Sequence, residues 1–137
     1  MLTGRCLCGE VTYEIEGKIS PIWLCHCSKC RRWTGSAFHA SAACSPDRFH
    51  WLSGVDSIGE YEDTPSYKVR FCKRCGTPVP WHDADRDLVF LHVGGLNEDP
   101  GRAIAHHIFV GSKAPWFEIL DDRAQYEEHR PQPDGAG

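Results

Sequence analysis

Seven of the eight cysteines in this 137-residue chain fall into three tight groups, and this grouping constrains the fold more than any other feature. The groups are Cys6 with Cys8, then Cys25 with Cys27 and Cys30, then Cys72 with Cys75. Thiols that are close along the chain can reach one ion together, so this pattern is typical of metal ligands. The natural partition is four sulfurs in one site and three in another. The sequence therefore predicts a fold in which bound metal ions join segments that are distant along the chain.

Disulfide bonds are the alternative use of an even number of cysteines. The first five residues lead straight into a cysteine pair, without the charged and apolar regions of a secretory signal. We therefore expect a reducing compartment, the cytoplasm, where clustered cysteines more often bind metal than pair as disulfides. The Cys6-Leu7-Cys8 spacing is also tight for two separate disulfides. Metal binding is the preferred interpretation.

The overall composition narrows the class of protein. A length of 137 residues suggests one domain with enough buried surface for a core. The net charge of −4 gives no reason to expect nucleic acid as a partner or an anionic membrane surface. The chain also lacks an apolar run of about 18 residues, so we expect no membrane-spanning helix.

Short apolar segments broken by glycine and proline predict a mainly β fold. The clearest strand lies within residues 9–16, where Val11, Tyr13 and Ile15 alternate with polar residues. Further strands are expected within residues 22–24, 38–44, 88–93 and 104–110. Ser28 is expected to cap a brief helical turn. We divide the chain into a zinc-binding β domain over residues 1–120 and a polar C-terminal extension over residues 121–137.

Zinc binds thiolates well and prefers four tetrahedral ligands, and a catalytic zinc site keeps one position for water or substrate. The pairs Cys6/Cys8 and Cys72/Cys75 can join two distant segments in one closed four-sulfur site. The group from Cys25 to Cys30 supplies only three sulfurs. Its fourth ligand is Cys44, His26 or an external molecule.

The two candidates within the chain each have a simpler interpretation. Cys44 shares a predicted strand face with Phe38, Ala40 and Ala42, which favours a small buried hydrophobe. His26 lies between two predicted ligands, so in an extended segment its side chain points away from the metal. We expect it to support the ligands or to be partly exposed. His106 and His107 read as ordinary residues at the start of a strand.

Charge suggests what the three-sulfur site binds. Three thiolates around Zn²⁺ leave a net charge of −1, which makes the ion a weak activator of water. Coordination still removes the proton from an incoming thiol. The site is therefore expected to hold an exogenous thiol. Lys29, Arg31, Arg32 and Lys113 would attract its carboxylates, or they form a solvated basic face.

Four motifs in order resemble the glutathione-dependent formaldehyde-activating enzyme family, which includes centromere protein V-like members. They are Gly4–Gly9 (GRCLCG), Cys25–Cys30 (CHCSKC), Phe71–Gly76 (FCKRCG) and His107–Trp116 (HIFVGSKAPW). The resemblance runs from about residue 3 to residue 120. It implies a β-tent fold of short antiparallel sheets stapled by zinc.

The resemblance also implies two zinc ions per chain and a reaction. Cys6, Cys8, Cys72 and Cys75 would hold a structural zinc, and Cys25, Cys27 and Cys30 a catalytic zinc. The implied activity is that of S-(hydroxymethyl)glutathione synthase, a carbon–sulfur lyase joining glutathione and formaldehyde. Two alternatives stay open: a non-catalytic zinc module that binds a thiol carrier or protein partner, and a cysteine-rich structural protein with one zinc.

Overall fold

The computed structural model describes residues 1–131, so the last six residues of the predicted C-terminal extension lie outside the described part. The chain forms two compact units, one of residues 1–20 with 41–102 and the other of residues 21–40 with the chain from residue 103 onward. The predicted mainly β fold of short antiparallel sheets is confirmed. In residues 1–131 no helix is both long and apolar enough to cross a membrane.

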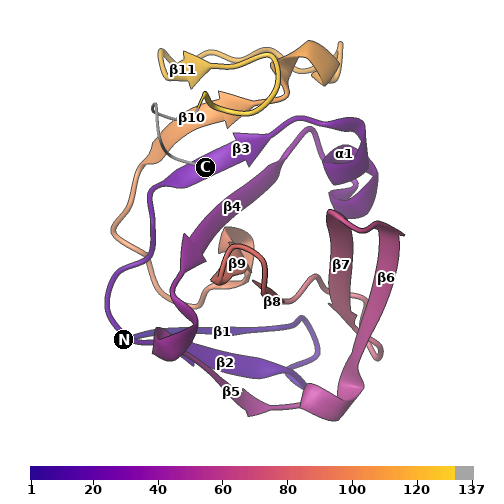
Figure 1. Ribbon diagram of the computed structural model, residues 1–137, viewed down its shortest axis with the longest axis vertical. Helices are drawn as coiled ribbons and strands as arrows, with labels where there is room; N and C mark the ends of the chain where they lie inside the picture. The colour runs from indigo at the N-terminus through magenta and orange to yellow at the C-terminus, as the bar shows by residue number, and fades with distance from the viewer. Residues whose placement is uncertain (132–137) are drawn as a thin grey trace. The chain divides into compact units, whose positions relative to one another are not determined.

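The first unit contains a three-stranded antiparallel sheet, with β2 in the centre (Figure 1). Its strands are β1 (Leu2–Arg5), β2 (Thr12–Ile15) and β5 (Phe49–Ser53). Val11, Tyr13 and Ile15 are buried, as their alternation predicted. The ring of Tyr13 packs against those of Phe49 and Trp51 on the neighbouring strand. The first cysteine pair lies in the turn between β1 and β2. These contacts pack the sheet from which that turn extends.

The other strands pair as antiparallel hairpins and ladders, and all the residues paired in them belong to the first unit. They are β6 (Ile58–Thr64) with β7 (Tyr67–Cys72), and β9 (Leu88–His92) with β4 (His39–Cys44) and β8 (Trp81–Asp83). Short 3₁₀ turns lie at Pro46–Arg48, Val55–Ser57 and Val93–Gly95. The strand expected at residues 38–44 is present, but Ser41 to Cys44 are all buried. The alternation along β4 therefore does not separate a core face from a solvent face.

The second unit is built around β10 (Ile104–Ile108), which runs parallel to both β3 (Ile22–Cys25) and β11 (Ala124–Gln125) (Figure 1). A 3₁₀ turn at Val110–Ser112 follows β10. Residues beyond position 120 form backbone hydrogen bonds with β10 and with the residue after it. The amide of Tyr126 donates to the carbonyl of His107 at 3.0 Å, and the amide of Phe109 donates to the carbonyl of Glu128 at 3.0 Å. The described part of the extension is thus joined to this unit by backbone hydrogen bonds.

Helix α1 (Ser28–Thr34) follows β3 after two residues. The prediction that Ser28 caps it is wrong, because the cap is Cys27, whose sulfur accepts a hydrogen bond from the amide of Cys30 at 3.2 Å. The helix ends at Gly35, which takes a left-handed conformation with φ of 67°. The capping atom at the start of the helix is therefore also one of the clustered sulfurs.

Candidate metal centres

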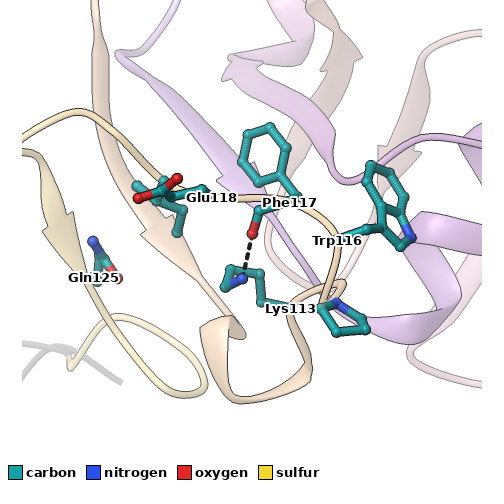
Figure 2. Close-up of a pocket in the computed structure, with 7 residues that line it drawn as sticks. Lys113, Trp116, Phe117, Glu118 and Gln125 are labelled. Carbon is teal, nitrogen blue, oxygen red and sulfur yellow. Dashed lines mark hydrogen bonds between the residues drawn. The ribbon is translucent and has the colours of Figure 1, made fainter.

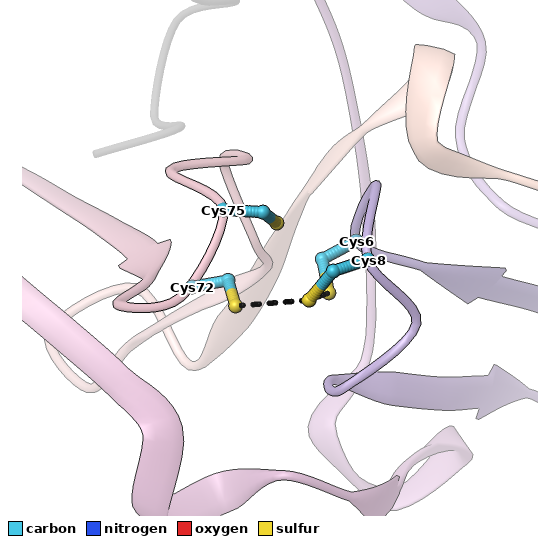
Figure 3. A group of neighbouring side chains, drawn as sticks. All are labelled: Cys6, Cys8, Cys72 and Cys75. Atoms are coloured by element: carbon cyan, nitrogen blue, oxygen red, sulfur yellow. Dashed lines mark hydrogen bonds between the residues drawn. The ribbon is translucent and has the colours of Figure 1, made fainter.

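The first sulfur group joins two turns of the first unit. Cys6 and Cys8 follow β1, Cys72 ends β7, and Cys75 lies in the next turn. Figure 3 shows the four side chains turned toward one another, and all four sulfurs lie within 4.8 Å of each other. The separations are 3.6 Å between Cys6 and Cys8 and 3.9 Å between Cys8 and Cys72. A tetrahedron with Zn–S bonds of about 2.3 Å needs sulfurs about 3.8 Å apart, so this donor set fits zinc.

A glycine follows each cysteine pair and closes its turn. The amide of Gly9 donates to the carbonyl of Cys6 at 3.1 Å, and that of Gly76 to Cys72 at 2.7 Å. Both glycines have φ near 80°, a left-handed conformation that other residues adopt only with strain. The sequence predicted this role for Gly9. The same local geometry therefore aims both pairs of sulfurs inward.

Hydrogen bonds and burial set the electrostatics of this group. Cys6 and Cys72 are buried in a small core with Val11 and Val79, and the Val11 amide donates to the Cys6 sulfur at 3.2 Å. A hydrogen bond from the Thr77 hydroxyl, at 3.2 Å, helps to lower the pKa of Cys75 to about 5. Donors that stabilise thiolates prepare the group for a cation.

Thr77 was not expected from the sequence, yet it connects the two turns. Its hydroxyl oxygen accepts the Leu7 amide hydrogen at 2.9 Å and contacts the Cys75 sulfur. Replacing Thr77 by valine keeps the shape but removes both bonds. We expect a loss of about 1–3 kcal/mol in the free energy of unfolding, measured by chemical denaturation of the metal-loaded protein. Thr64→Val, which removes a hydroxyl contact to Ser66 at a hairpin end, should change it by less than about 0.5 kcal/mol. Equal losses would contradict the linking role.

The second sulfur group lies in the second unit, where β3 meets α1. Cys25 ends β3, Cys27 caps the helix, and Cys30 lies in its first turn. Their three sulfurs lie within 4.8 Å of one another, and no fourth donor joins them in the described residues. Hydrogen bonds from the thiols of Cys25 and Cys30 hold the pKa of Cys27 well below its usual range. The same sharing raises the pKa of Cys25. Both sulfur groups could hold metal ions, consistent with zinc.

Cys44 belongs to neither sulfur group within residues 1–131. Its side chain is buried in β4, and this burial raises the pKa of its thiol to about 11. A buried thiol that resists ionisation behaves as a small hydrophobe. This environment agrees with the core interpretation of Cys44.

The expectation of a partly exposed His26 is wrong and its supporting role remains, whereas His107 is not the ordinary strand residue that the sequence suggested. His26 is fully buried, and its Nε2 lies 2.8 Å from Nδ1 of His107. His107, expected to be an ordinary residue, is 1% exposed and bonds through Nε2 to both oxygens of Asp121, at 2.9 and 3.1 Å. These partners are far apart in sequence, so no local pattern indicated the contact. A chain of hydrogen-bonded polar side chains thus begins at His26, the residue between Cys25 and Cys27.

A pocket of about 540 Å³ lies in the second unit (Figure 2). Its lining residues are Lys113, Pro115, Trp116, Phe117, Glu118, Ile119 and Gln125. The Lys113 ammonium donates to the backbone carbonyls of Ala114 and Phe117, so this cation braces the loop. The ring of Phe117 packs 6.0 Å from that of His26, between centroids. One wall of the pocket therefore contacts the histidine that lies between Cys25 and Cys27.

Comparisons with solved structures and with family models found similar proteins. No curated protein matches the chain. A crystal structure of a Rhodobacter sphaeroides protein is similar, with a TM-score of 0.60 and 21% identity over 75% of this chain and 99% of that one, which shows a shared fold. The sequence profile described as "Glutathione-dependent formaldehyde-activating enzyme" matches residues 1–112. Since this match covers most of the chain, the protein belongs to the glutathione-dependent formaldehyde-activating enzyme family.

Proposed function

We propose that this protein is a zinc-dependent carbon–sulfur lyase that acts on a thiol–aldehyde adduct, with glutathione and formaldehyde as the first pair to test. Cys6, Cys8, Cys72 and Cys75 would hold a structural zinc, and Cys25, Cys27 and Cys30 a catalytic one. Family membership supports glutathione-dependent formaldehyde activation in general.

The observation that carries the proposal is the difference between the two sulfur groups. One offers four donors, which is the complete set for a structural zinc site. The other offers three within the described residues, as expected for a site that takes a ligand from outside the protein. Cys27 is only half-buried, so the group has contact with solvent. A small thiol is the ligand that this arrangement favours.

The reaction balances without a redox partner. The thiol sulfur forms a bond to the aldehyde carbon while the carbonyl π electrons move to oxygen, and the thiol proton ends on that oxygen. The lyase direction reverses these steps and breaks the carbon–sulfur bond. Bound zinc would supply the thiolate form of the substrate at neutral pH.

The protein's own residues would position the substrate. On α1, Lys29 lies between Cys27 and Cys30, and Arg31 and Arg32 follow Cys30. All three would attract the carboxylates of glutathione. The adjacent hydrogen bonds of His26 would hold the ligand segment in place. A thiol without carboxylates should therefore react more slowly than glutathione at equal concentration.

Exchange spectroscopy by NMR tests the activity directly. The adduct also forms without an enzyme, so the quantity to measure is the exchange rate between free glutathione and S-(hydroxymethyl)glutathione with and without the zinc-loaded protein. We expect acceleration that disappears after a chelator removes the metal and that is weaker for 2-mercaptoethanol. Exchange rates equal to those in buffer alone would contradict a lyase and favour a zinc-binding module.

A further inference from the structure

The most unusual polar feature of the second unit is a buried chain of hydrogen bonds behind the three-sulfur group. It runs from His26 to His107 and on to Asp121, with distances of 2.8 Å and 2.9 Å. The three residues come from the segment after β3, from β10 and from the loop before β11. Both histidine rings are buried, whereas the Asp121 side chain is 38% exposed. A buried polar chain of this kind is costly unless its members are paired, so its presence calls for a role.

The position of His26 shows what the chain of hydrogen bonds can control. Its backbone amide donates to the carbonyl of Ile108 at 3.0 Å, and its ring packs against Phe38 and Phe117. In an extended segment neighbouring side chains point to opposite sides, so anchoring the ring inward turns the sulfurs of Cys25 and Cys27 to the other side. The ring orientation of His26 is therefore coupled to the placement of two sulfur donors.

Asp121 determines which ring nitrogens of His107 and His26 carry protons. Hydrogen bonds from the Arg123 amide and from His107 hold the pKa of Asp121 below its usual range, so it is an ionised acceptor. His107 must then carry a proton on Nε2. When Nε2 is the ring nitrogen of His107 that carries the proton, its Nδ1 accepts from the Nε2–H of His26. Nδ1 of His26 is left as an acceptor, and the described residues offer it no hydrogen-bond donor.

We propose that Asp121 is a positioning residue for the three-sulfur site. Through His107 it fixes the orientation and the tautomer of His26, and through His26 it places the sulfurs of Cys25 and Cys27 for a metal ion. Groups behind metal ligands commonly act in this way, and their loss lowers metal affinity about 10–100-fold. The inference rests on the proposed function only in taking the three-sulfur group as a metal site.

Asp121→Asn is the sharpest test, because it preserves size. The new amide keeps an oxygen for the Arg123 amide but turns an NH₂ group toward His107. With the NH₂ group in the place of Oδ2, 2.9 Å from Nε2 of His107, we expect His107 to accept at Nε2 and to donate from Nδ1. The proton on His26 then moves from Nε2 to Nδ1. Long-range ¹H–¹⁵N correlation spectra of the imidazoles report this reversal without metal or substrate. Asp121→Ala removes the acceptor without supplying a donor, and Asp122→Asn is the matched control at the exposed neighbouring position.

The metal affinity of the second site is the companion measurement. We expect competition with a chelator to show a 10–100-fold loss for Asp121→Asn and Asp121→Ala, no loss for Asp122→Asn, and an unchanged four-sulfur site in all three. An unchanged His26 tautomer, an unchanged affinity, or an equal loss in Asp122→Asn would overturn the inference. If the unmodified protein binds no metal at Cys25, Cys27 and Cys30, the proposed function fails as well, whereas a failure confined to Asp121→Asn leaves it intact.

Discussion

The Cys72→Ser protein is expected to lose one zinc per chain together with most of its stability. Cys72 is fully buried in the core where the two cysteine turns meet. Structural zinc sites contribute an apparent 10–16 kcal/mol or so to the folding of small zinc peptides, whereas whole domains are stable by only about 5–15 kcal/mol. Losing the site should therefore leave the first unit marginal or unfolded. Thermal unfolding followed by circular dichroism, with metal analysis of the same samples, measures both effects.

Cys44→Ala provides the control for this variant. It also removes a buried thiol from the first unit, but from a position outside the four-sulfur group. We expect it to keep both zinc ions and to lower the free energy of unfolding by only about 1 kcal/mol. If Cys72→Ser kept its full metal content and matched Cys44→Ala in stability, the first sulfur group would not be a structural zinc site.

Cys27→Ser should abolish catalysis while preserving the fold. Cys27 is both a sulfur donor and the cap of α1, and serine is a good capping residue, so the helix start survives the change. The oxygen that replaces the sulfur is a much poorer zinc ligand than a thiolate. We expect the loss of the second zinc, retention of the first, and an exchange rate equal to the uncatalysed background. NMR exchange and metal analysis on one preparation test these outcomes together.

Ser28→Ala is the matched control, since it alters the start of the same helix without removing a sulfur. It should retain two zinc ions and at least half of the exchange activity. Full activity in Cys27→Ser would show that the reaction takes place elsewhere. Loss of activity in Ser28→Ala with both metals bound would show that the helix start, and not the sulfur donor, limits the reaction.

Much of the fold was predictable because its signals are local. The alternation of Val11, Tyr13 and Ile15 placed β2, and the short apolar runs placed β3, β9 and β10 to within a few residues. The division of seven cysteines into groups of four and three follows from spacing and is reproduced by the sulfur positions. The turn at Gly9 could be predicted because so tight a turn needs a left-handed backbone conformation, which glycine adopts without strain.

The features that sequence could not supply depend on contacts between distant residues. His107 reaches His26 across 81 positions, and Thr77 reaches Leu7 across 70. A histidine in a strand gives no sign of its partner, and a threonine after a cysteine pair gives no sign that it bridges two turns. The capping of α1 was assigned to Ser28 from residue preference, whereas the sulfur of Cys27 takes that role.

Zinc stoichiometry with X-ray absorption at the zinc edge, recorded with and without glutathione, is the most direct test of the central claim. We expect two zinc ions per chain and an average of about 3.5 sulfurs per zinc, rising to about 4 when glutathione binds the three-sulfur site. One zinc per chain would contradict this expectation. So would four sulfurs around both ions before glutathione is added, because the second site would then be closed by the protein itself.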